Sequence, residues 1–250
     1  MKKIIAVILL LIGSTTWAEE LHIVHCLYGC PSGTPETNDL IIREIYALSS
    51  NDDTKFADWV AYRVTKETIG TTASLNRDWK ADPLLDDNET LEPGDYKRAN
   101  RELDTDRGHQ VPLASFAGTI FWRSTNFLSN ITPQKSDLNQ GAWVDLEEAV
   151  RHAAYHLGEV YVVTGPLYEH PTEGLPEANE EHKVPSGYWK VVATKGGATA
   201  FLFDQGTPRD DDYCGHVVLL TEIEQRNGLI LFPTAAQGWP SDNLSTWLGC

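Results

Sequence analysis

The sequence predicts a single α+β domain with a largely antiparallel central sheet flanked by helices. The 250 residues are 41% hydrophobic and 22% charged, as in ordinary soluble globular proteins. No repeat, low-complexity tract or Pro/Ser-rich linker divides the chain, although its length would allow one large domain or two small ones. The strand-like and helix-like segments do not alternate regularly, as they would around a parallel sheet.

Residues 1–18 are predicted to be a secretory signal peptide. Two lysines are followed by the apolar run 4–13, and Ala18 precedes a favourable cleavage position. A membrane anchor needs roughly 20 apolar residues, more than this run provides, and no later stretch is long enough. We therefore expect a mature domain over 19–250 that is secreted, to the periplasm or beyond the cell, and does not remain in the membrane.

Hydrophobic patterning places the expected elements along the mature chain. Runs rich in β-branched and aromatic residues predict strands at 56–64, 161–164, 189–194, 200–203 and 216–220. Apolar residues at helical spacing predict helices at 39–47, 138–157 and 222–227, with Asn38 as a possible N-cap of the first and Gly228 as the stop of the last. The segment 82–95 is rich in Asp, Glu, Asn, Pro and Gly and predicts a long surface loop.

The cysteines predict disulfides. Cys26, Cys30, Cys214 and Cys250 form an even set, as expected of a protein sent to an oxidising compartment. Of the three pairings that four cysteines allow, we favour Cys26–Cys30 with Cys214–Cys250, because each bond then closes the shorter loop. A zinc site is the alternative, but no second Cys/His pair lies near the C-x3-C motif.

The net charge excludes polyanion binding through a basic overall surface. The chain has 20 Lys and Arg against 36 Asp and Glu, a net charge of −16, which becomes −18 when the two lysines of the signal peptide are lost. Any binding of a nucleic acid must therefore depend on a local cationic site.

The chemistry of the chain is concentrated in 104–151. In Asp106-Arg107-Gly108-His109, the histidine can act as a base near neutral pH, and the arginine presents a fork of donors that suits a phosphate. On the predicted helix, Asn139, Glu147 and Arg151 are spaced by multiples of four, so that an amide, a carboxylate and a guanidinium face the same way. Oxygen donors of this kind suit a hydrated Mg²⁺, which needs few protein ligands.

Each of these features has a simpler explanation when it is taken alone. A lone histidine such as His109 is more often structural, and Glu147 with Arg151 is most simply a surface ion pair worth roughly 0.3 kcal/mol. Their combination in one segment favours a functional site.

Longer stretches of the chain resemble the DNA/RNA non-specific endonuclease family, with a close match to its secreted type. The longest and most specific stretch runs from Asn130 to Trp143. The resemblance covers almost the whole mature chain through the cysteine pair at 26 and 30, residues 55–62, Arg77 with Trp79, and residues 126–134, 164–168, 185–191 and 201–205.

The resemblance implies a ββα-metal (His-Me finger) nuclease motif, with His109 on the hairpin and Asn139 on the helix. His109 would be the general base that activates water. Asn139 would be the single direct protein ligand of one hydrated Mg²⁺, with Mn²⁺ as a substitute ion. Glu147 would hold the waters of the metal.

The resemblance also implies a phosphate site. Arg77, Arg107 and Arg151 would grip the phosphate and stabilise developing charge, while Asn130 would support the cluster. Asp106 would position its loop and not bind the metal. The activity would be hydrolysis of DNA and RNA through phosphate contacts, with 5′-phosphate and 3′-hydroxyl ends and little sequence preference.

Two acidic residues, Asp78 and Asp145, depart from the family pattern and add negative charge near the expected substrate path. Together with the charge of −18, they predict repulsion of the polyanion at low ionic strength. Salt screens such repulsion beyond about 10 Å at 0.1 M, whereas counterion release weakens phosphate contacts as salt rises. We expect the first effect to dominate and activity to be highest at raised salt.

Two other functions stay open on the sequence alone. A catalytically silent, secreted nucleic-acid-binding module could keep the same fold, although the expected catalytic residues are all present. His152 and His156 have the spacing of zinc ligands in a protease helix, but the glutamate that follows the first histidine in that motif is missing. Family members include homodimers, and no interface is readable in this sequence.

Overall fold

The computed structural model describes residues 22–250. The predicted signal peptide lies outside these residues. Within the described range, no helix combines the length and the apolar character that crossing a membrane requires.

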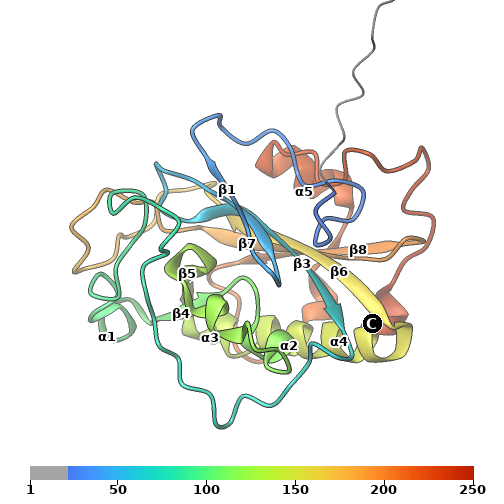
Figure 1. Ribbon diagram of the computed structural model, residues 1–250, viewed down its shortest axis with the longest axis horizontal. Coiled ribbons are helices and arrows are strands. Elements are labelled where there is room, and N and C mark those ends of the chain that lie inside the picture. Colours follow the sequence, from blue (N-terminus) through green and yellow to red (C-terminus); the bar gives the residue numbers. More distant parts are fainter. Residues whose placement is uncertain (1–21) are drawn as a thin grey trace, which may run out of the picture.

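In the described part of the chain, seven strands form a central antiparallel sheet (Figure 1). Neighbours in the order β1-β2-β3-β6-β7-β8-β9 are all antiparallel. The strands are β1 (Asp39–Ile42), β2 (Ala47–Ser50), β3 (Ala57–Thr65), β6 (Glu159–Leu167), β7 (Gly187–Ala193), β8 (Ala198–Asp204) and β9 (Val217–Val218). The predicted α+β class with a largely antiparallel sheet is confirmed.

Alternating side chains of the long strands build a core on each face of this sheet. In β7, Tyr188 belongs to the core beneath α4 (Ala142–Leu157), and the next residue, Trp189, belongs to the core that includes Ile223 of α5 (Leu220–Asn227). Figure 1 shows these two helices on opposite sides of the sheet. Because both faces are covered, every residue of β7 is buried.

A small second sheet lies beside the main one and leads into the helices. Strand β4 (Thr105–His109) pairs antiparallel with β5 (Ile131–Lys135), which runs directly into α3 (Ser136–Asn139) and then α4. This is a ββα arrangement, with His109 at the end of its first strand and Asn139 at the end of α3. The shorter helices are α1 (Ala99–Leu103), α2 (Leu113–Phe116), and the 3-10 helices η1 (Trp122–Asn126), η2 (Leu128–Asn130), η3 (Tyr213–His216) and η4 (Ser245–Leu248).

The helix predicted at 39–47 is wrong, since this segment forms β1 and the start of β2. Ile41 is 4% exposed, while Leu40 and Ile42 on either side are 53% and 44% exposed. That alternation is the two-residue period of a strand. Pairing of β1 with β2 supplies the hydrogen bonds that decide between the two structures.

The helix predicted at 138–157 is broken into α3 and α4 at Gln140 and Gly141. The break occurs where the chain packs against another segment: a Cβ at Gly141 would lie 2.2 Å from the carbonyl oxygen of Arg209. Asn139 is therefore not on the same helix as Glu147.

The remaining elements differ less from expectation. The strand predicted at 216–220 shortens to β9, because α5 already begins at Leu220. The end of α5 before Gly228 is as predicted, with that glycine at φ 74°. The segment 82–95 holds no helix or strand, as expected, but it is tied to the body through the buried Asp82, which pairs with Arg43 and accepts a hydrogen bond from Ser129.

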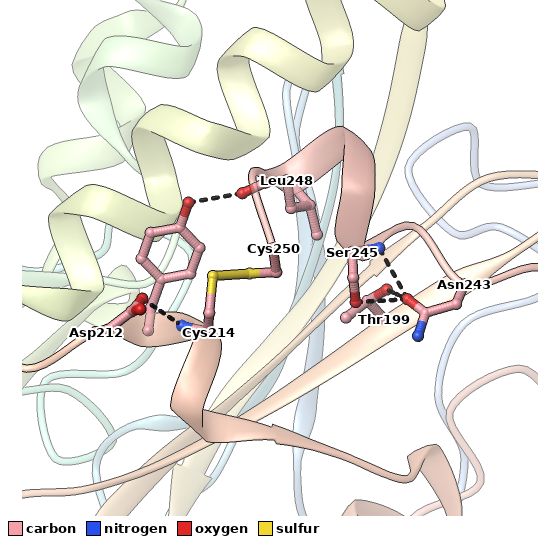
Figure 2. Close-up of a disulfide and its surroundings, with 8 residues drawn as sticks. Thr199, Asp212, Cys214, Asn243, Ser245, Leu248 and Cys250 are labelled. Carbon is pink, nitrogen blue, oxygen red and sulfur yellow. Dashed lines mark hydrogen bonds between the residues drawn. A yellow bond between two sulfur atoms is a disulfide. The ribbon is translucent and has the colours of Figure 1, made fainter.

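Both predicted disulfides are present. Cys26–Cys30 closes the loop at the start of the described chain, and Cys214–Cys250 ties the C-terminal residue to the segment after β8. Figure 2 shows the second bond, with Asp212 accepting a hydrogen bond from the amide of Cys214 (2.9 Å). The disulfide lies next to η4, which packs against α4.

Candidate active site

A cavity of about 710 Å³ opens between the loop before α1, strand β4 and helices α2 to α4. It collects the predicted site residues from four separate parts of the chain. Those that line it are Arg77, Arg107, His109, Asn139, Glu147 and Arg151. Asn139 faces the same cavity as Glu147 although the helix between them is broken.

The imidazole of His109 is held in one orientation. Its Nε2 lies 3.2 Å from Oδ1 of Asn126, and its ring packs against Trp79 with the ring centres 5.2 Å apart. An amide oxygen only accepts hydrogen bonds, so Nε2 carries the proton and Nδ1 keeps its lone pair. Burial lowers the pKa of His109 to about 4, and the charge of Arg77 acts in the same direction. His109 is therefore neutral at pH 7 and able to accept a proton.

The carboxylate of Asp106 fixes the side chain of Asn139. Nδ2 of Asn139 and Nε2 of Gln140 donate to one Asp106 oxygen at 3.0 and 2.7 Å, and Nδ2 of Asn100 donates to the other at 3.0 Å. The amide oxygen of Asn139 accepts no hydrogen bond from any residue within 22–250, which leaves it free for a ligand. Both oxygens of Asp106 are engaged, as expected of a positioning residue.

The carboxylate of Glu147 lies between the cavity and the protein interior. Its side chain is 12% exposed, and its Oε1 lies 3.7 Å from Nζ of the buried Lys190. Burial raises the pKa of Glu147, and the positive charges of Lys190 and Arg151 oppose that shift. Glu147 thus has a buried cation on its interior side, whereas Asp106, which also lines the cavity, pairs with no cation within residues 22–250.

The three arginines of the cavity keep their guanidinium groups available. Over the described residues, none of them forms an ion pair within 4.0 Å. Arg107 is held by a hydrogen bond to the carbonyl of Pro93 (3.1 Å) and lies over the rings of Tyr96 and Trp79. Arg77 is exposed. Unpaired arginines around one cavity make a local cationic site in a strongly acidic protein, which suits a phosphate.

Asn130 does not line the cavity and is fully buried. Its Oδ1 accepts from the amide of Val111 at 2.8 Å, and its Nδ2 donates to the carbonyls of Thr125 and Val111 at 2.9 and 3.2 Å. These bonds fasten the chain that follows His109 to the chain that follows Asn126. Asn130 therefore links these two segments and does not itself face the cavity.

Sequence reasoning assigned no role to Asn126 or Lys190. Asn126 lies four residues before Asn130, within a stretch that resembles the family. That placement is only a weak indication of a role for Asn126. A lysine in an apolar strand such as β7 is a stronger signal, because lysine is almost never fully buried unless it is paired.

The histidine pair of α4 lies apart from the cavity. His152 and His156 are both exposed, and neither lines the cavity. Nε2 of His152 lies 3.8 Å from Glu148, a neighbour on the same helix. Nothing in this arrangement favours a zinc protease.

Comparisons with known proteins point to one family. A family described as DNA/RNA non-specific endonuclease matches residues 27–238. A nuclease of Serratia marcescens is 46% identical over 248 residues, which cover 96% of this chain and 91% of the relative. Human mitochondrial endonuclease G is 29% identical over 221 residues, which cover 80% of this chain and 72% of that one.

The fold is also found in a solved structure. The crystal structure of a complex between EndoG and EndoGI contains a chain that superimposes with a TM-score of 0.69 at 23% identity. The match covers 82% of this chain and 90% of that chain.

Proposed function

Since this chain belongs to the DNA/RNA non-specific endonuclease family, we propose that it is a secreted, Mg²⁺-dependent enzyme that leaves 5′-phosphate and 3′-hydroxyl ends. The observation that carries the proposal is a cavity in which a neutral histidine, an amide oxygen, a carboxylate and three arginines meet, none of the arginines forming an ion pair with a residue of 22–250.

His109 activates the attacking water in this proposal. Nδ1 of a neutral imidazole accepts the proton, while the bond from Nε2–H to Asn126 keeps the ring in place as it becomes positive. A positioned base of this kind contributes roughly 10²–10⁴-fold to the rate. The water oxygen bonds to phosphorus as the bond between phosphorus and the 3′-oxygen breaks. The phosphate stays on the 5′-oxygen, and the 3′-oxygen takes a proton from solvent water to become the hydroxyl.

The donors in the cavity fit a hard divalent ion. Asn139 presents a free amide oxygen, and Glu147 presents a carboxylate to the same space. Oxygen donors of this type, few in number, suit Mg²⁺, which keeps several of its waters. When bound, Mg²⁺ supplies stabilisation of negative charge on the phosphate and on the leaving oxygen. Asn139 would hold the ion directly and Glu147 would hold its waters, with Mn²⁺ as a substitute.

The arginines bind the scissile phosphate. Arg77, Arg107 and Arg151 lie around one cavity and donate to non-bridging oxygens, so their contacts carry no information about the base sequence. DNA and RNA share this phosphate backbone, which supports action on both.

Export is supported by the two disulfides, because such bonds persist in oxidising compartments. If residues 1–18 are the signal peptide, N-terminal sequencing of the exported protein gives Glu19 as the first residue. Retention of the first 18 residues would contradict this part of the proposal.

An activity optimum at raised salt is part of the proposal. The acidic surface opposes approach of a polyanion, and Asp145 is exposed in the first turn of α4, next in the chain to Val144, which lines the cavity. Asp78, beside Arg77, is exposed as well, although it pairs with Lys80 at 3.0 Å.

Cleavage of supercoiled plasmid and of single-stranded RNA, with Mg²⁺ and with EDTA, tests the chemistry. We expect both substrates to be cut with Mg²⁺ and neither with EDTA. The nicked DNA should be closed again by a DNA ligase, which requires a 5′-phosphate beside a 3′-hydroxyl. Cleavage in EDTA, or nicks that ligase cannot close without end repair, would contradict the proposal.

A further inference from the structure

Lys190 is a fully buried cation behind the active site. It belongs to β7, has no exposed surface, and points its ammonium at α4. Nζ lies 3.8 Å from the ring centre of Trp143 and 3.7 Å from Oε1 of Glu147. It has no hydrogen-bond partner among the residues that the structure describes.

The neighbours of Lys190 on the same strand make this position unusual. Tyr188 and Val192, two residues to either side, point to the same face of the sheet and belong to the apolar core beneath α4. A buried charge is costly unless it is paired. Replacing a buried ion pair by apolar residues of similar size is often neutral or stabilising. Packing beneath α4 alone therefore does not explain a lysine here.

Two further buried donors belong to the same core beneath α4. The hydroxyl of Tyr62 and Nε1 of Trp143 both lack a hydrogen-bond partner in the described part of the protein. Trp143 precedes Glu147 by one helical turn, and the charges of Glu147 and Arg151 both act on Tyr62. The core beneath Glu147 thus holds the Lys190 ammonium together with an N–H and an O–H group, each of which can donate to a negative oxygen.

We propose that Lys190 is a positioning residue for the nuclease reaction. Its ammonium holds the inner oxygen of the Glu147 carboxylate, so that the other oxygen faces the cavity in one orientation, ready to accept hydrogen bonds from the waters of the divalent ion. The inference rests on the role proposed above for Glu147, and it extends that role to a residue that touches neither substrate nor metal.

The first test replaces the charge and keeps the size. K190M keeps an unbranched stem and loses the ammonium, K190Q is a second neutral variant, and K190R restores a cation. We expect K190M to lower kcat by about 10- to 100-fold, as loss of an outer partner of a metal site does. We also expect it to raise the Mg²⁺ concentration for half-maximal rate, with little change in KM for DNA. K190R should recover part of the loss.

A matched control separates this effect from lost packing. V192A creates a small void on the same face of β7, two residues from Lys190. It should lower the melting temperature and leave kcat and the Mg²⁺ requirement unchanged. K190M should also lower the melting temperature, because it leaves the Glu147 carboxylate without its cation, but unlike V192A it should change kcat and the Mg²⁺ requirement as well. If K190M does not fold, K190Q is measured in its place with the same expected result.

A double-mutant cycle with E147Q decides whether Lys190 acts through Glu147. When the carboxylate is absent, K190M should cause no further loss, so E147Q and E147Q/K190M should have equal kcat. A wild-type kcat in both neutral variants would overturn the inference, and so would a K190M loss of the same size in the E147Q background. Wild-type turnover in E147Q alone would instead overturn the role proposed for Glu147, and the inference with it.

Discussion

Two neighbouring side chains set the orientation of the His109 imidazole. Trp79 packs against its ring, and Oδ1 of Asn126 accepts a hydrogen bond from Nε2–H. The sequence predicts the role of this histidine because Asp-Arg-Gly-His stands in one segment with the other expected site residues and the chain resembles the family. It did not predict the partner, because Asn126 is 17 residues away and reaches His109 only after η1 folds against β4.

The low pKa of His109 predicts an unusual dependence of activity on pH. Since burial lowers this pKa to about 4, the base stays unprotonated down to well below pH 6. Measured at constant Mg²⁺, kcat/KM should be level from pH 7 to about 5 and fall at lower pH as His109 is protonated. A fall centred near pH 6.5, the value of an exposed histidine, would contradict this environment.

The same shift affects folding stability. The unfolded chain binds a proton at this histidine below about pH 6.5, while the folded chain does so only below about 4. The free energy of unfolding should therefore fall as the pH drops between these values. H109A should show a smaller fall over that range in urea titrations.

Replacement of Asn126 by aspartate tests the hydrogen bond directly. A carboxylate beside Nε2–H favours the protonated imidazole, so N126D should raise the pKa of His109 and move the acid limb of kcat/KM to higher pH. The shift should be about one pH unit or more for a charge at hydrogen-bond distance. N126D with an unmoved acid limb would mean that Asn126 does not contact the catalytic base.

Among the elements, the ββα unit was predictable in part. The resemblance placed His109 on a hairpin and Asn139 on a helix, and the structure has β4, β5 and α3 in these places. The spacing by four did not reveal the break at Gly141, because the Arg209 segment that causes it is distant in sequence. The wrong helix at 39–47 has a similar origin, since the pairing of β1 with β2 exists only in the folded chain.

Gly141 is expected to set the angle between α3 and α4. In G141A the new Cβ would meet the carbonyl of Arg209 at 2.2 Å, so the two helices must shift. We expect a loss of about 1–3 kcal/mol in the free energy of unfolding, typical of overpacking, and a lower kcat because Asn139 and Glu147 move apart. G215A is the control, since a Cβ at Gly215 meets no atom within 4 Å. Equal stability of the two variants in urea titrations would contradict this role.

At the scale of the whole molecule, the acidic surface and the cationic cavity act against each other. The chain carries a net charge of −16 while its cavity holds three unpaired arginines. Composition revealed the first property, and only the fold brings the arginines together from the loop before α1, from β4 and from α4.

This opposition predicts how salt affects catalysis. With NaCl raised from about 10 mM to 500 mM, kcat/KM on plasmid DNA should first rise. The reason is that salt screens the repulsion between the acidic surface and the DNA, since the Debye length falls from about 30 Å at 10 mM to about 10 Å at 0.1 M. It should then decline as phosphate contacts weaken. D145N should move the maximum to lower salt. A rate that only falls from the lowest NaCl upward would refute this balance of forces.

The central claim is that His109 provides the base and Asn139 holds the ion in one cavity. A Mg²⁺ titration of plasmid cleavage by the wild type, H109A and N139A tests it most directly, with circular dichroism to verify that each variant is folded. H109A should lower kcat by about 10²–10⁴-fold at an unchanged half-saturating Mg²⁺ concentration, whereas N139A should raise that concentration. Near-normal turnover in H109A, or an unchanged Mg²⁺ requirement in N139A, would contradict the account.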